Sequence, residues 1–271
     1  MQWLFLTLLF ILGACFGSFL CCQARRLHLK SNPKKKGAKT QLGSRSVCFH
    51  CHYQLKWYDN LPILSWMLLR GKCRKCHKKI GIAEILSELA LALAFLSLGT
   101  TINIISANPL DWAIFIATLL FTAVLAFLAI YDGIYGELPT LYLIISIAIA
   151  VTILVLKEVD LLLTSSFTTS QIYNPLISIL ILGGLYLLLY KISHGKWVGD
   201  GDWLLGSSIA IALYDSWLAL ITLFLANLLA CLVMYPILRK QKHAKIYFGP
   251  FMVIAFVITL TFQNFFYYAI S

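Results

Sequence analysis

The sequence contains few charged residues for its length. Only 12% of its 271 residues are charged and 60% are hydrophobic, whereas a soluble domain carries about 25% charged residues. Acidic residues are the scarcer kind, with 11 Asp and Glu against 22 Lys and Arg. This composition argues against a soluble globular protein and predicts a polytopic membrane protein. An Asp at the centre of a membrane helix costs roughly 2.5 to 3.5 kcal/mol, so the few acids near apolar segments are functional candidates.

Apolar runs of about 20 residues predict membrane-spanning helices. The predicted segments are residues 2–22, 82–105, 110–131, 138–156, 175–192, 203–213, 216–238 and 248–270. The sixth is short, since its 11 residues make only about 17 Å of helix, so we expect a half-buried helix there. The first lacks a basic flank and a cleavage site, which predicts a retained helix. The fold class is therefore an all-α polytopic membrane protein with about eight transmembrane helices.

The positive charge is concentrated in one loop. Fifteen of the 22 basic residues lie between Arg25 and Lys79, with Asp59 as the single acid. Because this block separates two apolar segments, the positive-inside rule places it in the cytoplasm. This location argues against nucleic acid and allows contact with anionic headgroups of the lipid bilayer; the alternative is a solvated cytoplasmic loop. The predicted domains are a first membrane helix at residues 1–22, a cytoplasmic basic loop at 23–80 and a membrane domain of helices 2–8 at 81–271.

Four of the eight cysteines lie in this loop as two C-x-x-C pairs. The pairs are Cys48 with Cys51 and Cys73 with Cys76, separated by 21 residues. This spacing is typical of a structural zinc site with four thiolate ligands. A cytoplasmic, reducing location argues against disulfides. The alternative is two pairs of free thiols.

Two aspartates stand at the ends of apolar segments. Asp132 follows one apolar run, and Asp202 closes the stretch Gly199-Asp200-Gly201-Asp202 before another. With the basic loop inside, both fall on the cytoplasmic face. Two carboxyls a few Å apart share one proton, so that one acts as base and the other as acid in peptide hydrolysis. The glycines let the backbone approach a substrate closely. The alternatives are that each aspartate simply ends a helix at the interface, or that Asp-Gly-Asp is a solvent turn.

A second acidic pair begins the segment after the loop. Glu84 and Glu88 are one helical turn apart and share a face. Glu88 is a candidate for binding substrate or cofactor, and the alternative is contact with lipid headgroups.

Several motifs together resemble the type IV prepilin peptidases, which are membrane aspartyl proteases of the GxGD kind. The resemblance rests on Tyr131-Asp132 with Leu138-Pro139, Gly199-x-Gly201-Asp202, Gly17-Ser18-Phe19-Leu20 with Arg25-Arg26-Leu27, the two cysteine pairs, the stretch 57–66, Glu88, and Phe248-Gly249-Pro250-Phe251. It covers nearly the whole chain. Departures from the family pattern are Thr140, Leu204 and Cys21.

This resemblance implies an activity and a location. Asp132 and Asp202 would be catalytic, with Gly199, Gly201 and Glu88 in supporting positions. The enzyme would remove the short basic leader of prepilin or pseudopilin substrates in a bacterial cytoplasmic (inner) membrane. It would also methylate the new amino terminus with S-adenosylmethionine. The alternatives are an ion- or proton-coupled transporter that uses the intramembrane acids, and a GxGD protease that cleaves within transmembrane helices.

Overall fold

The computed structural model describes residues 2–31, 46–48, 50–164, 169–195, 198–240 and 247–270. These residues form helices and no β-strand, with two isolated bridges, Val47–Gln54 and Lys72–Lys79. The predicted all-α class is therefore confirmed. The chain divides into two compact units, Met1–Gly99 and Thr100–Ser271. The lysine-rich part of the predicted loop, residues 32–45, lies outside the described residues.

The first unit is built on two helices packed along one another, α1 (Gln2–Ser31) and α4 (Ile82–Gly99). Glycines allow their close approach, because a Cβ at Gly13 would lie 2.5 Å from the carbonyl oxygen of Leu91. At Gly17 it would lie 2.6 Å from the Cα of Glu88. Small residues have this role in membrane helix pairs generally.

The described part of the loop between α1 and α4, residues 46–48 and 50–81, contains two short elements. These are the 3-10 helix η1 (Trp57–Asn60) and the single-turn helix α3 (Leu64–Leu68). Helix α1 itself continues to Ser31, past Cys22 where the apolar run ends. Part of the predicted loop is thus a helical extension of the first span.

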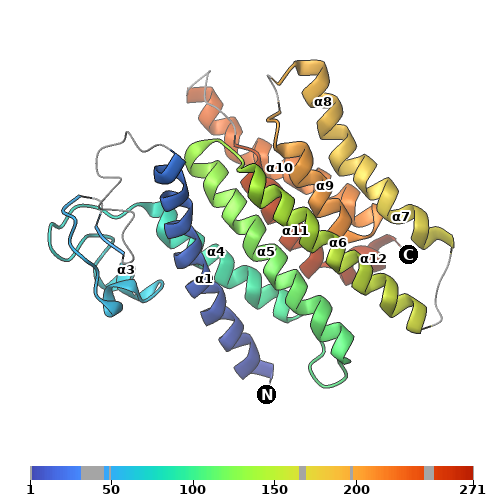
Figure 1. Cartoon of the computed structure of the whole chain (residues 1–271), viewed down its shortest axis with the longest axis horizontal. Helices are drawn as coiled ribbons and strands as arrows, with labels where there is room; N and C mark the ends of the chain where they lie inside the picture. The colour runs from blue at the N-terminus through green and yellow to red at the C-terminus, as the bar shows by residue number, and fades with distance from the viewer. Residues whose placement is uncertain are drawn as a thin grey trace. The chain divides into compact units, whose positions relative to one another are not determined.

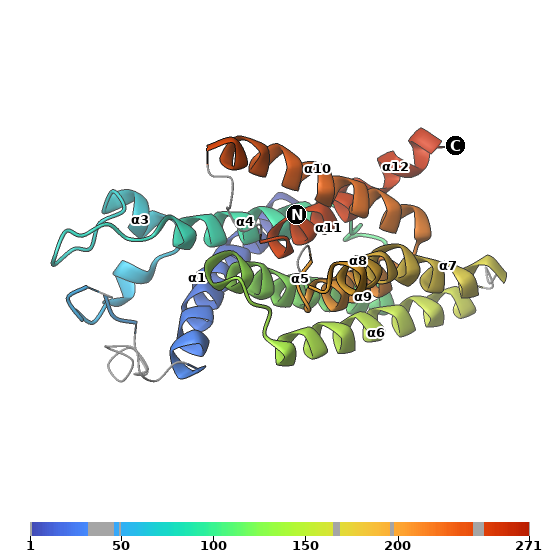
Figure 2. The ribbon, with the colours of Figure 1, turned by 90° about the horizontal axis from the view of Figure 1, so that it is seen from above.

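The second unit is a bundle of helices whose arrangement is shown in Figures 1 and 2. Its elements are α5 (Pro109–Tyr135), α6 (Thr140–Leu163), α7 (Thr169–Ile179), the π-helical segment η2 (Leu180–Gly184), α8 (Leu185–Ser193), α9 (Asp202–Leu213), α10 (Ser216–Lys240), α11 (Gly249–Thr261) and α12 (Gln263–Ile270). Residues 173–193 form one helical span through α7, η2 and α8. The predicted spans 138–156 and 175–192 leave residues 157–174 between them, but α6 extends into this stretch and α7 begins within it.

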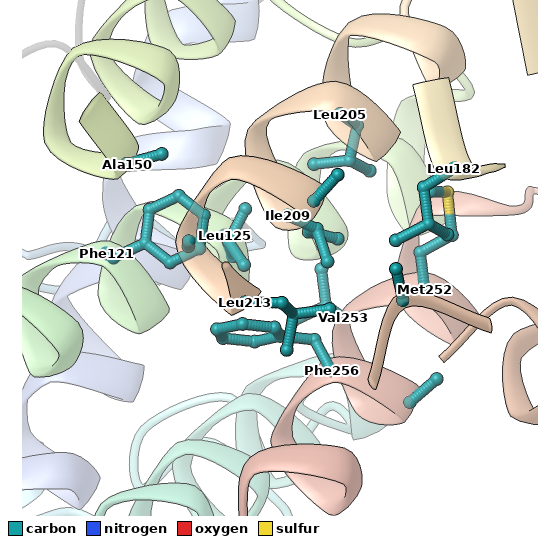
Figure 3. Packing of buried hydrophobic residues seen from close by; sticks show 14 of the residues in the cluster. Phe121, Leu125, Ala150, Leu182, Leu205, Ile209, Leu213, Met252, Val253 and Phe256 are labelled. Carbon is teal, nitrogen blue, oxygen red and sulfur yellow. The ribbon is translucent and has the colours of Figure 1, made fainter. Parts of the chain in front are cut away.

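Helix α9 lies in the core of this second unit. Leu205, Ile209 and Leu213 are buried on it, and Figure 3 shows them between side chains of α5, η2 and α11. A helix that is apolar on all sides is one that is buried. The aspartate at its first position is therefore attached to the most enclosed element of the bundle.

Six described helices are long and apolar enough to cross a membrane, and α9 and α11 are shorter apolar helices. Helix α9 has 12 residues, so the sixth segment is short, as the sequence predicted. The prediction of one helix over residues 248–270 is wrong. This stretch forms two helices, α11 and α12, with a break at Phe262. Polar Gln263 and Asn264 follow the break. The 13 residues of α11 make roughly 20 Å of helix, less than the hydrocarbon core of about 30 Å.

Candidate active site and metal centre

Asp132 lies buried in the last turn of α5, and backbone of another helix holds its carboxylate. The N–H of Gly249, the first residue of α11, donates a hydrogen bond of 2.9 Å to Oδ2 of Asp132. A Cβ at position 249 would lie 2.8 Å from the same oxygen. The helix ends just beyond, where Gly136 has φ +69° and donates its N–H to the carbonyl of Asp132. Glycine at 249 therefore permits an approach that a side chain would block.

Asp202 is the first residue of α9 and is also buried. The N–H of Gly199 donates a 2.8 Å hydrogen bond to its Oδ2, and the N–H of Asp202 donates to the carbonyl of Gly199. A carboxylate at a helix N-terminus is also favoured by the helix dipole. Asp200 is exposed. Of the two aspartates in this stretch, Asp202 is therefore the one built into the fold.

The two aspartate segments contact one another within the second unit. A Cβ at Gly201 would lie 2.7 Å from the Cβ of Leu138, so the residue before Asp202 packs directly on the segment that follows Asp132. The charge of Asp202 also acts on Asp132. The relative exposures of Asp132 and Asp202 are 6% and 7%. Both predicted acids are therefore buried in the second unit, near enough for the charge of one to act on the other.

This arrangement has the parts needed for acid–base hydrolysis. Each carboxylate accepts a backbone N–H through Oδ2, which fixes its orientation. Two adjacent carboxyls in such a site share one proton and serve as base and acid. Tyr186, buried on α8, lies within electrostatic range of Asp202 and packs against Phe248 with ring centroids 5.3 Å apart.

The four loop cysteines form a compact cluster in the first unit. The sulfur atoms of Cys48, Cys51, Cys73 and Cys76 all lie within 4.8 Å of one another. The Cys48–Cys76 and Cys51–Cys73 Sγ distances are 3.8 and 4.0 Å. A tetrahedral site with Zn–S bonds of about 2.3 Å requires S–S separations of about 3.8 Å. The donor set therefore fits a zinc ion.

The backbone around these cysteines also favours thiolates. Burial opposes ionisation of Cys73, but hydrogen bonds from the backbone of Cys76 and Lys75 and from neighbouring thiols outweigh it and lower its pKa to about 7. The residues after the two knuckles, His52 and His77, both have φ 55°. Such paired tight turns are what two C-x-x-C knuckles require.

Glu88 has a role that its position in the sequence did not reveal. Its Oε2 accepts a 2.7 Å hydrogen bond from the N–H of Ile63, which has φ 62°. Glu84, one turn earlier, forms an ion pair with Arg25 of α1. Both glutamates line a cavity of about 410 Å³, together with Arg26 and Asn60. Its volume is within the range of small-molecule sites, about 300 to 1,000 Å³.

Three contact residues were missed or only partly indicated by the sequence. Gly249 belongs to a stretch noted for its resemblance, but nothing in the sequence places its N–H on Asp132. Leu138 was noted as part of the same signature as Asp132, and its contact with Gly201 is new. Ile63 belongs to the stretch 57–66 noted for its resemblance, but nothing in the sequence indicates that its backbone N–H contacts Glu88.

Comparison with known proteins identifies relatives over most of the chain. The model of the family described as "Bacterial Peptidase A24 N-terminal domain" matches residues 11–102. A "Prepilin leader peptidase/N-methyltransferase" of Aeromonas hydrophila is 28% identical over 96% of this chain and 91% of the relative. One of Pectobacterium carotovorum subsp. carotovorum is 30% identical over 81% of this chain and 75% of the relative.

Other matches are shorter. A protein with the same name from Myxococcus xanthus is 39% identical over 34% of this chain, and the match spans only 25% of the relative's length. No solved structure matches the chain significantly. The two long matches nevertheless extend across both units, from the cysteine loop to the aspartate segments. The chain therefore belongs to the prepilin leader peptidase/N-methyltransferase family.

Proposed function

We propose that this protein is an aspartyl endopeptidase that removes the leader of prepilin-like substrates, with Asp132 and Asp202 as its catalytic residues. One observation supports this above the others. Two buried carboxylates, 70 residues apart in sequence, lie in electrostatic range with each oriented by a glycine N–H. The names of the related proteins supply the substrate class.

The reaction follows from a carboxyl pair that holds one proton. The ionised carboxylate removes a proton from water, and the resulting hydroxide attacks the scissile carbonyl carbon. The protonated carboxyl donates its proton to the carbonyl oxygen. When the tetrahedral intermediate collapses, the C–N bond breaks and the first carboxyl gives its proton to the leaving amine. The second carboxylate takes a proton from one hydroxyl of the intermediate as the C=O bond re-forms, which restores the singly protonated pair. Gly199 and Gly201 form the loop beside Asp202, where a substrate strand can approach the backbone.

The same family name implies a second activity, N-methylation of the new amino terminus. S-adenosylmethionine is the proposed methyl donor. Its carboxylate and its ammonium and sulfonium groups are of opposite charge, and the 410 Å³ cavity of the first unit carries both arginines and glutamates. Glu84, Glu88 and Arg26 are therefore the candidates for holding it.

The proposed metal and location complete this assignment. Cys48, Cys51, Cys73 and Cys76 would hold a structural zinc ion. The basic loop and the ends of α5 and α9 that carry the aspartates would face the cytoplasm at a bacterial inner membrane. Prepilins and pseudopilins of type IV pili and of secretion are the expected partners.

The test is mass spectrometry of a prepilin co-expressed with the wild-type protein or with Asp132→Asn or Asp202→Asn. Asn keeps the shape and an acceptor oxygen but cannot act as base, so each variant is expected to leave the leader uncut. Wild type should release the leader and add about 14 Da per methyl group. Asp200→Asn is the matched control and should cleave normally.

Cleavage by both single variants would refute the proposed catalytic pair. Ion flux that depends on Asp132, in a protein that cuts no prepilin, would select the transporter alternative. Cleavage inside the hydrophobic helix of the substrate, with the leader junction intact, would select the intramembrane alternative.

A further inference from the structure

The cysteine loop presents a cluster of exposed apolar side chains that the proposed reaction does not use. We call it the α3 apolar surface and define it as Trp57, Leu61, Leu64, Met67 and Leu68. Leu68 is 81% exposed, Trp57 77% and Met67 63%. Apolar patches of this kind on an otherwise polar segment mark contact with a partner or a membrane.

A hydrogen bond fixes the level of this surface along the membrane helices of the first unit. The N–H of Ile63, one residue before α3, donates to the carboxylate of Glu88 on α4. Glu88 in turn packs against Gly17 of α1. Gly17 is five residues before Cys22, where the apolar run ends, so this contact lies about 7.5 Å of helix inside that end. The start of α3 is therefore held beside the apolar part of α1 and α4, near its boundary with the interfacial layer.

The ribbon agrees with that level. Figure 1 shows α3 beside the pair α1 and α4, at a height between the two ends of α1 rather than beyond either end. In Figure 2 it again lies to one side of α1. A segment held at this level lies beside the apolar part of two candidate membrane helices, where lipid is the expected neighbour.

The charge around the surface has one sign. Among the described residues of the loop, 46–80, seven are Lys or Arg and one is acidic, Asp59. That acid is already paired with Arg74 at 2.7 Å. Basic residues beside Trp and Leu are the usual composition of segments that lie in an anionic membrane interface.

The surface is also attached to the metal-binding knuckle. The N–H of Gly71 donates to the carbonyl of Trp66 in α3 at 2.9 Å, and a Cβ at Gly71 would lie 2.9 Å from the Trp66 ring. Cys73 follows two residues later. The cysteine cluster therefore holds α3 in place, so that its apolar side chains are presented as a unit.

We propose that the α3 apolar surface docks into the interface of the bilayer and that the surrounding basic side chains gather anionic lipid there. This gives the cysteine loop a third attachment to the membrane, in addition to α1 and α4. The proposal does not depend on the peptidase reaction.

The experiment is photo-crosslinking of the full chain in nanodiscs of phosphatidylcholine and phosphatidylglycerol, first without prepilin and then with it. p-Benzoylphenylalanine replaces Leu68, and in a second variant Met67, both of which are exposed and tolerate a larger side chain. The matched control carries the same group at Lys78, an exposed residue of the same loop. Intact-protein mass spectrometry counts the lipid adducts.

We expect several-fold more lipid adducts at Leu68 and Met67 than at Lys78, with phosphatidylglycerol over-represented relative to its share of the lipid. Equal labelling at the three positions would overturn the proposal. Adducts that form only when prepilin is added, and then with prepilin, would assign the surface to the substrate instead. Adducts without enrichment of phosphatidylglycerol would overturn the electrostatic part.

Discussion

At the scale of single residues, the contact between Gly201 and Leu138 connects the two aspartate segments. The hydrogen at the Cα of Gly201 faces the Leu138 side chain at a distance that leaves no room for a methyl group. A larger residue at 201 must move the loop that carries Asp202 or the turn that follows Asp132. The distance between the two carboxylates therefore depends on the size of the residues at positions 201 and 138, neither of which takes part in the chemistry.

This contact predicts a compensating pair of substitutions. Gly201→Ala should reduce prepilin cleavage by about 10²-fold, the effect of roughly 1 Å of misplacement in an active site. Gly201→Ala combined with Leu138→Gly should recover much of that loss, because the atom nearest to the new methyl group is the Cβ of Leu138, which glycine lacks. Initial rates on a purified prepilin measure both variants.

The control is Gly184→Ala, for which the nearest atom to the added Cβ is 3.7 Å away. It should leave the rate nearly unchanged. If Leu138→Gly fails to improve the Gly201→Ala enzyme, the contact does not set the geometry of the pair.

At the scale of secondary-structure elements, the packing of α1 on α4 depends on glycine. A Cβ at Gly17 would lie 2.5 Å from the carbonyl oxygen of Ser87, a backbone atom that cannot move aside alone. Gly17→Ala should therefore destabilise this helix pair by about 1 to 3 kcal/mol, the usual cost of overpacking. Hydrogen exchange in nanodiscs should show faster exchange in the first unit.

The exposed Cys15 on the same helix offers a control. Cys15→Ala should exchange at the wild-type rate. Faster exchange in the second unit alone would contradict the assignment of this contact.

The cysteine loop is the other element whose order depends on a local interaction. It has two very short helices and no strand among its described residues, so its own apolar core is small. Structural zinc sites contribute folding free energy directly. We expect about one zinc ion per chain in the purified protein and almost none in Cys73→Ser, with protease cleavage appearing within residues 46–80.

Cys231→Ser provides the matched comparison, because Cys231 is exposed on α10 outside the cluster. It should keep the full zinc content, as measured by inductively coupled plasma mass spectrometry. Wild-type protein that is free of metal yet resists protease would contradict the structural role.

At the scale of the whole molecule, the two candidate sites lie in different compact units. The aspartates belong to residues 100–271 and the cysteines to residues 1–99. The double variant Asp132→Asn/Asp202→Asn should therefore keep its zinc content while losing cleavage. Its melting temperature should stay within a few degrees of wild type, because Asn still accepts the N–H bonds from Gly199 and Gly249. A fall in zinc content would show that the units are not independent.

Much of this organisation could be predicted from hydrophobic run length and charge. Apolar runs identify the spans because the bilayer requires about 20 residues in each, and α9 was correctly expected to be short. The break at Phe262 was missed, because the prediction used the average hydrophobicity of residues 248–270 and the two polar residues after Phe262 barely change that average. The extension of α1 to Ser31 was missed for the opposite reason, because a helix continues beyond the membrane wherever its residues allow it.

The candidate sites also contain some features that the sequence predicts and others that it does not. The cysteine cluster could be predicted because four ligands in two local pairs encode their own geometry. The roles of Gly249 and Ile63 could not, because each contributes a backbone N–H whose position depends on how distant helices pack. Whether Asp132 and Asp202 catalyse the reaction stays a prediction until the variants are measured.

The backbone hydrogen bonds to the aspartates have a consequence for inhibition. A compound that bound across the two carboxylates would rely on groups that the reaction itself requires. The donors that orient them, at Gly199 and Gly249, are main-chain amides, which any residue except proline would still supply. Substitution of Gly199 or Gly249 by a residue other than proline would therefore not remove these donors and could not confer resistance in that way. A larger residue at either position would also disturb the catalytic carboxylate itself.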